Sequence, residues 1–281
     1  MAQDDRSARH DDREMRIGAI ARPDAYLLHE VIRAQGDDEI RRHGGALFLS
    51  AFAAGLSIAL SLIVPGVLKS HLPAADWTKI PVSMGYAVGF LVVVLGRQQL
   101  FTENTITPVL PFLHDRTPKT AWRVLRLWGV VLAGNILATA AIAAVLAHSE
   151  AFPPTVQAAF AEISHTAIAH GFGATVIKAV LAGWIIALMV WILPATGAAA
   201  PFVIALMTWL VALCGLAHVV VGSVEAFYLV LTGAASMADY LWRFFLPTLI
   251  GNVFGGVALV AALNFGQVAP EVEETRSVEG E

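Results

Sequence analysis

The chain has 281 residues, of which 57% are hydrophobic and only 14% charged, whereas an ordinary soluble domain carries about 25% charged residues. The charges are concentrated at the two ends: residues 1–45 carry 18 acidic or basic side chains and residues 266–281 carry six. The residues between share 16, too few to cover a water-soluble surface, so this stretch is predicted to face lipid. This composition excludes a soluble enzyme. The net charge of −4 excludes a basic surface for nucleic acid, and the single cysteine excludes an intrachain disulfide.

The N-terminal segment, residues 1–45, contains one amphipathic stretch. In residues 25–43, Leu27, Leu28, Val31 and Ile32 lie on one side of a heavily charged sequence. The pattern predicts a helix that is solvated or lies at the membrane surface. At the other end of the chain, the acidic residues 266–281 are predicted to be disordered.

The segment between them, residues 46–265, contains apolar runs long enough to span a membrane, for which about 20 residues are needed. Four such runs are continuous, at residues 45–64, 122–147, 175–193 and 242–265. Two further apolar segments, 82–113 and 201–231, are interrupted around residues 96–104 and 214–218. Non-helical backbone persists at membrane depth only beside protein or a water-filled cavity, so the two interrupted segments are predicted to line one.

The distribution of Lys and Arg predicts the orientation. With a cytoplasmic N-terminus, 13 of these side chains lie on the cytoplasmic side and three, Lys69, Lys79 and Arg243, lie outside. This excess predicts that both termini are cytoplasmic.

The chain also contains an internal repeat. Residues 54–60 and 182–188 are identical at five of seven positions, and Gly134-Asn135 corresponds to Gly251-Asn252. The repeat predicts two three-helix halves, residues 46–147 and 174–265, which are inverted relative to each other because each has an odd number of crossings. The predicted fold is therefore an all-α membrane protein of six transmembrane helices, in which the broken second and fifth helices meet near the midplane.

Polar residues in the two breaks are the candidates for function. His218 lies in the second break, where an imidazole could donate a hydrogen bond to a solute or transfer a proton to it. Thr102 lies in the first break, and its hydroxyl could serve a solute or His218, or equally close a turn. Asn135 and Asn252 are predicted to support the freed backbone with their amides.

Four other ionisable residues, Arg97, Glu103, Lys178 and Glu225, lie within the apolar segments. Each of them could guide ions. Because an isolated charge in a membrane costs at least about 2.5 to 3.5 kcal/mol at the centre, the expected role of all four is to pair across a subunit interface or to reach water.

Sites for metals and nucleotides are not predicted. His165 and His170 are spaced i, i+5, which does not place two ligands on one helix face, and no carboxylate or thiolate cluster accompanies them. The chain lacks a Walker loop and a complete dinucleotide-binding motif. No cofactor is expected.

The run Gly96-Arg97-Gln98-Gln99-Leu100-Phe101-Thr102 resembles the formate/nitrite transporter family, together with the two Gly-Asn pairs and the break at His218. The resemblance covers nearly all of residues 25–265 and is strongest to the YfdC-type branch of bacterial inner-membrane proteins. It implies an aquaporin-like homopentamer in the lipid bilayer, in which each protomer has its own pore for small monovalent anions such as formate or nitrite.

The resemblance also implies roles for particular residues. His218 matches the family's central histidine, and Thr102 matches the threonine of its first broken helix, preceded by Leu100 and Phe101. Tyr86, Phe90 and Val211 match the apolar constrictions on either side of the histidine.

The sequence departs from the family pattern at three positions. Gly171, next to His170, stands where anion-conducting members have a lysine, and Ala187 and Gly222 stand where they have asparagines. The prediction is a channel or proton-coupled permease for a weak-acid anion. The alternatives are a pore for small neutral solutes and a closed structural or sensory membrane oligomer.

Overall fold

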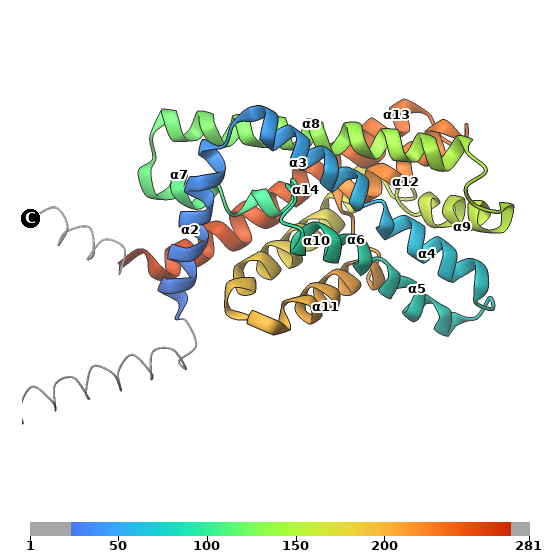
Figure 1. Cartoon of the computed structure of the whole chain (residues 1–281), viewed down its shortest axis with the longest axis horizontal. Coiled ribbons are helices and arrows are strands. Elements are labelled where there is room, and N and C mark those ends of the chain that lie inside the picture. Colours follow the sequence, from blue (N-terminus) through green and yellow to red (C-terminus); the bar gives the residue numbers. More distant parts are fainter. Residues whose placement is uncertain (1–23, 271–281) are drawn as a thin grey trace, which may run out of the picture.

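The computed structural model describes residues 24–270, in which every regular element is a helix (Figure 1). Residues 1–23 and 271–281 lie outside the described range, and with them most of the acidic tail that was predicted to be disordered. In chain order, the α-helices are α2 (Ala25–Arg41), α3 (Gly44–Ser57), α4 (Leu60–His71), α5 (Lys79–Gly85), α6 (Ala87–Leu95), α7 (Val109–Asp115), α8 (Pro118–His148), α9 (Pro154–His165), α10 (Phe172–Ile192), α11 (Ala200–Leu213), α12 (Val219–Leu231), α13 (Met237–Asp239) and α14 (Leu246–Gly256).

Five helical segments within residues 24–270 are long and apolar enough to cross a membrane. They are Gly44–His71, Asp76–Leu95, Pro118–His148, Phe172–Ala195 and Met237–Pro270. Two shorter apolar helical segments, Gly197–Leu213 and Val219–Leu231, lie on either side of the second interruption. The chain is therefore a multi-pass membrane protein.

The helices extend beyond the apolar runs that predict them. The first run continues to His71, and the last helical segment continues to Pro270, past the expected boundary at residue 265. α8 begins before the predicted run at residue 122, because the Thr117 hydroxyl accepts a hydrogen bond from Thr120 N and Pro118 occupies the first turn. An apolar run marks the part of a helix that faces lipid or protein, whereas caps set where the helix ends.

Both predicted interruptions are present. Regular α-helix stops after Leu95 and resumes at Val109, with one 3₁₀ turn, η2 (Glu103–Thr105), between them. It stops again after Leu213 and resumes at Val219. Arg97 and Gly215 adopt positive φ angles of 50° and 60°, which turn the chain sharply at each break.

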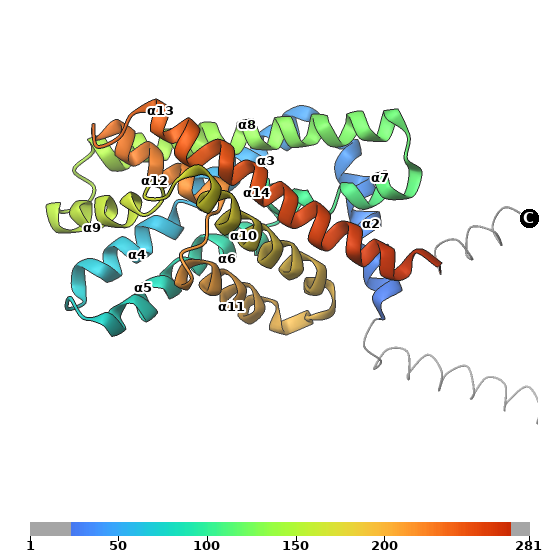
Figure 2. The same ribbon diagram turned by 180° about the vertical axis from the view of Figure 1, so that it is seen from behind.

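Two helix pairs, α3 with α8 and α10 with α14, form the most extensive contacts (Figures 1 and 2). Gly55 of α3 lies against the backbone of Asn135, where an added Cβ would come within 2.6 Å of the Asn135 carbonyl oxygen. Gly183 of α10 lies in the same way against Asn252, where the corresponding distance is 2.4 Å. The repeated glycines thus let each asparagine-bearing helix approach its neighbour closely.

The predicted amphipathic helix forms as α2. Its buried residues include His29, Ile32 and Ile40, and Gly36 lies directly against the Thr107 carbonyl and Pro111. One side of α2 therefore packs on α7 and its neighbours, whereas Leu27 of the predicted apolar side stays exposed.

Candidate functional site

The two interruptions meet inside the molecule. Thr102, from the first break, and His218, from the second, are both buried, and Thr102 Oγ1 lies 2.7 Å from His218 Nε2. This hydrogen bond joins residues 116 positions apart in the chain. The two segments singled out by their irregular sequence therefore form one site.

His218 is held on both sides of its ring. It is the N-cap of α12, and its Nδ1 accepts a hydrogen bond of 3.2 Å from Val221 N. Because Nδ1 is an acceptor, the neutral imidazole carries its hydrogen on Nε2 and donates it to the Thr102 hydroxyl. The ring of Phe90 packs edge-on against the imidazole, with 5.1 Å between ring centroids.

Asn135 binds the first break with three hydrogen bonds. Its Oδ1 accepts from Phe101 N, and its Nδ2 donates to the carbonyls of Gln99 and Ala51.

Asn252 binds the second break in the same pattern. Its Oδ1 accepts from Val219 N, and its Nδ2 donates to the carbonyls of Ala217 and Ala179. All six distances lie between 2.7 and 2.9 Å. The two amides therefore hold corresponding stretches of non-helical backbone.

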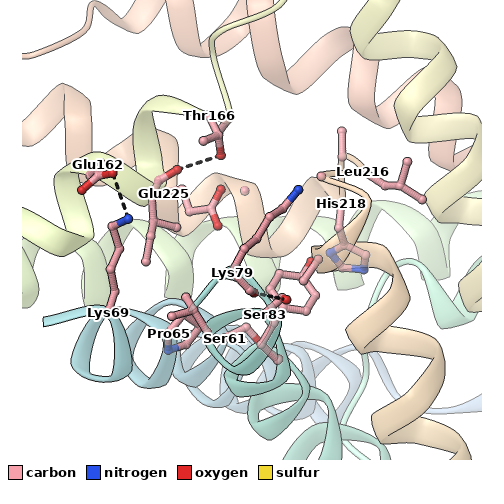
Figure 3. A pocket seen from close by; sticks show the side chains of 18 of the residues that line it. Ser61, Pro65, Lys69, Lys79, Ser83, Glu162, Thr166, Leu216, His218 and Glu225 are labelled. Carbon is pink, nitrogen blue, oxygen red and sulfur yellow. Dashed lines mark hydrogen bonds and ion pairs between the residues drawn. The ribbon is translucent and has the colours of Figure 1, made fainter. Parts of the chain in front are cut away.

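A cavity of about 650 Å³ is lined by His218 and the residues just before it in the second break (Figure 3). We call it the lysine cavity, because Lys69, Lys79 and Lys178 line it together with Tyr86 and His218. Its other ionisable wall residues are Asp76, Glu162, His170 and Glu225. Lys69 is paired with Glu162 at 2.8 Å, and Lys178 Nζ donates to the Gly215 carbonyl at 3.0 Å.

A second cavity, of about 350 Å³, is lined by residues of the first break. We call it the glutamine cavity, because Gln35, Gln98 and Gln99 line it together with Leu100 and Glu103. Arg97 and Glu39 are its other charged wall residues. Oε1 of Gln98 and Oε1 of Glu103 are buried without a hydrogen-bond partner.

The other predicted pore residues are all buried, but they differ in position. Tyr86 lines the lysine cavity and Leu100 the glutamine cavity. Phe90, Phe101 and Val211 line neither cavity and lie in the core between helices, where the Phe101 ring packs against Trp128.

The four ionisable residues of the apolar segments differ in their surroundings. Lys178, Glu103 and Glu225 line cavities inside the protomer, as does the exposed Arg97. Within residues 24–270, none of the four forms an ion pair. The cavities thus provide a local reason for their presence.

Sequence reasoning did not single out Lys69, Lys79 or Glu162 as cavity residues. Lys69 and Lys79 were counted only as charges beyond the ends of spans, and α9, which carries Glu162, lies outside the predicted spans. The packing of α9 against α4 and α12 brings Glu162 to the cavity beside Lys69, and the packing of α5 against α4 adds Lys79.

At two of the three positions that depart from the family pattern, other side chains pack closely around the residue. A Cβ added to Gly222 would lie 2.3 Å from the Phe244 ring, so a larger side chain fits there only if this ring moves. Ala187 is completely buried in a second apolar cluster. Gly171, at the start of α10, has open space around it.

The fold and the meeting of two interrupted segments between two cavities define a membrane protein of the channel and transporter class. The sequence profile of the formate/nitrite transporter family matches residues 26–266, and the chain belongs to that family. The inner membrane protein YfdC of Escherichia coli is 41% identical over 255 residues, which cover 91% of this chain and 82% of YfdC.

Two solved structures share the fold. A pentameric formate channel with formate bound superimposes with a TM-score of 0.67 at 18% identity, covering 79% of this chain and 96% of the channel. An ion channel of the same family superimposes with a TM-score of 0.74 at 15% identity, covering 85% of this chain and 98% of that protein. The relatives of this chain are thus membrane transport proteins rather than enzymes.

Proposed function

We propose that this protein is a channel or proton-coupled permease for small monovalent anions of weak acids, such as formate or nitrite, in the bacterial inner membrane, with both termini cytoplasmic. The observation that carries the proposal is the Thr102–His218 hydrogen bond, which lies at the junction of two interrupted segments, each of which lines a cavity. The formate bound to one of the structural relatives supports the class of solute.

The architecture that we propose is two inverted repeats, each with three crossings and a broken middle helix. The identical hydrogen-bond patterns of Asn135 and Asn252 support it, and so does the equivalent packing of Gly55 and Gly183. In this architecture the fifth crossing is formed by α11 and α12 together, on either side of the second break. An inverted arrangement brings two such breaks together near the membrane midplane.

The proposed path runs from the lysine cavity, past His218 and Thr102, to the glutamine cavity. Lysine side chains attract an anion to the entrance, and the imidazole N–H and the Thr102 hydroxyl offer it hydrogen bonds at the narrowest point. Leu100, Phe101 and Phe90, with Tyr86 and Val211, form the apolar walls of this passage. These walls exclude a hydrated ion, because moving a bare charge into apolar surroundings is prohibitively costly.

We also propose that the protein assembles as a homopentamer, like the pentameric formate channel that shares its fold. Large apolar side chains remain exposed on the outside of the protomer, among them Trp122, Leu49 and Phe202. Lipid and neighbouring subunits would cover them.

Flux assays in liposomes test the proposal. Wild-type protein is expected to transport formate, nitrite or hydrosulfide, whereas His218→Ala and Thr102→Val each lose about tenfold in flux, as removal of a hydrogen bond worth about 1.5 kcal/mol predicts. His218→Asn, which keeps an amide donor, separates loss of the hydrogen bond from loss of the fold. Ser83→Ala is the matched control, because Ser83 lines the lysine cavity while its hydroxyl bonds the Lys79 carbonyl of its own helix.

Equal flux in wild type and His218→Ala would remove His218 from the mechanism. Flux of uncharged solutes alone, insensitive to membrane potential, would show a pore for neutral solutes. No flux of any small solute would show a closed oligomer.

A further inference from the structure

We propose that Glu225 and Glu103 are the residues that exchange a proton with the transported weak acid, one on each side of the His218–Thr102 pair. The inference rests on the proposed function and adds the proton donor and acceptor to it. Glu225 lines the lysine cavity and Glu103 the glutamine cavity.

His218 is not free to supply the proton to the solute, because both of its ring nitrogens are hydrogen-bonded. Its Nδ1 faces the N–H of Val221, and its Nε2–H is engaged by Thr102. A histidine that gave up the Nε2 hydrogen would need a second proton on Nδ1, which would then point at another donor. In this geometry the imidazole donates a hydrogen bond but does not relay a proton.

Glu225 lies in the lysine cavity, which a solute crosses before it reaches His218. His218, Gly222 and Glu225 are spaced i, i+4 and i+7 on α12, and all three line the lysine cavity. At 1.5 Å per residue, Glu225 lies about 10 Å along the helix from His218. Between the two, Gly222 lies against the ring of Phe244, and both residues form part of the wall of the cavity.

The carboxyl of Glu225 is available for proton exchange with a solute. Within residues 24–270, its carboxyl forms no hydrogen bond and no ion pair, whereas Glu162 of the same cavity is held by Lys69. Asp76 is also unpaired, but it is exposed to solvent at the rim. The other ionisable groups that line this cavity are Tyr86 from between α5 and α6, Lys79 from α5, His170 from the α9–α10 connection, Lys178 from α10 and His218.

Glu103 occupies a comparable position on the far side. It follows Thr102 directly, and its buried Oε1 has no partner. The other charged side chains that face the glutamine cavity are Glu39 from α2 and Arg97 from the first break. Glu103 is therefore the carboxyl nearest in sequence to the point where a solute leaves the constriction.

Carboxyl groups suit this exchange chemically. A carboxylic acid and a solute such as formic acid have similar acid strength, so the proton passes between them at little free-energy cost, whereas an ammonium group with a pKa near 10.4 is a poor donor to such an anion. In the lysine cavity the O–H bond of Glu225 breaks and an O–H bond forms on the anion, which leaves a Glu225 carboxylate and a neutral acid.

The neutral acid then passes His218 and Thr102, and its O–H bond breaks as the Glu103 carboxylate takes the proton. The anion leaves through the glutamine cavity, and Glu103 releases the proton to water while Glu225 takes up another. One proton therefore moves with each anion, and the transport is electroneutral.

The test uses the full-length protein in liposomes, with formate as the probe and protein-free vesicles subtracted. Formate uptake and the internal pH are recorded together, with equal pH on both sides, between about pH 5.5 and 8.5. Wild type is expected to carry one proton per formate and to lose flux as pH rises through the range. For Glu225→Gln and Glu103→Gln, flux should fall by about a hundredfold, the usual contribution of a general acid, and should no longer depend on pH.

Two further variants separate a proton-transfer role from a structural one. Glu225→Asp keeps a carboxyl and should retain pH-dependent flux. Glu150→Gln, at an exposed carboxyl that lines neither cavity, should behave as wild type. If Glu225→Gln keeps the wild-type flux, stoichiometry and pH profile, the inference is wrong while the proposed function stands. If wild type itself carries no formate or nitrite, both are wrong.

Discussion

At the scale of single residues, the site depends on contacts between positions far apart in the chain. Thr102 and His218 bond directly, and each of their segments is held by one asparagine amide. These amides form hydrogen bonds with backbone groups that lack a partner where the two helices are interrupted inside the membrane.

This role predicts a large effect of replacing Asn252 by alanine. The substitution leaves Val219 N–H and the carbonyls of Ala217 and Ala179 without their partner, and each buried unpaired group costs about 1 to 3 kcal/mol. Asn252→Ala is therefore expected to lower the free energy of unfolding by about 3 kcal/mol or more. The measurement is the thermal unfolding midpoint of the detergent-solubilised protein, together with solute flux.

Thr139→Val is the matched control for this substitution. Thr139 is equally buried, but its hydroxyl bonds only the Ile136 carbonyl of its own helix. Similar losses of stability in the two variants would contradict a specific role of the Asn252 amide.

At the scale of elements, α2 is tied to the rest of the molecule by a buried histidine. Burial lowers the pKa of His29 below its ordinary value of 6.5; Arg33 and His114 act in the same direction, and the neighbouring Glu30 carboxylate opposes the shift without reversing it. The His29 ring also lies against Phe265 of the last helical segment, with 5.7 Å between ring centroids.

The lowered pKa predicts that the packing of α2 is pH-dependent. Below about pH 6.5 the unfolded chain binds a proton on His29 more readily than the folded one, so the stability that His29 contributes above this pH is lost as the pH falls. The unfolding midpoint of wild type should decrease by a few degrees between pH 7.5 and 5.5, and that of His29→Gln by less. An identical decrease in both proteins would assign the effect to other groups.

At the scale of the whole molecule, the apolar exterior of one protomer requires lipid or further copies of the chain. The pentamer that we propose predicts a particle of five times the 29.9 kDa chain mass. Native mass spectrometry from mild detergent measures it directly. A monomer or a trimer as the largest stable species would contradict this assembly.

The sequence by itself determined that the chain is an all-helical membrane protein with two interrupted segments. Apolar runs, and Gly, Pro and polar residues within them, can be identified from the local sequence. The breaks near residues 96–104 and 214–218 could therefore be placed without a structure. The matched Gly-Asn pairs likewise predicted supporting roles for Asn135 and Asn252, whose amides bond the non-helical backbone of the two breaks.

Only the tertiary structure decided which side chains surround the two cavities. Lys69, Glu162 and Glu225 come from three helices, α4, α9 and α12, whose order in sequence says nothing about which of their faces meet. A charge in an apolar segment has the same local pattern whether it faces lipid, a partner or a cavity. The cost of burying it depends on the three-dimensional surroundings, and these arise only when the helices pack.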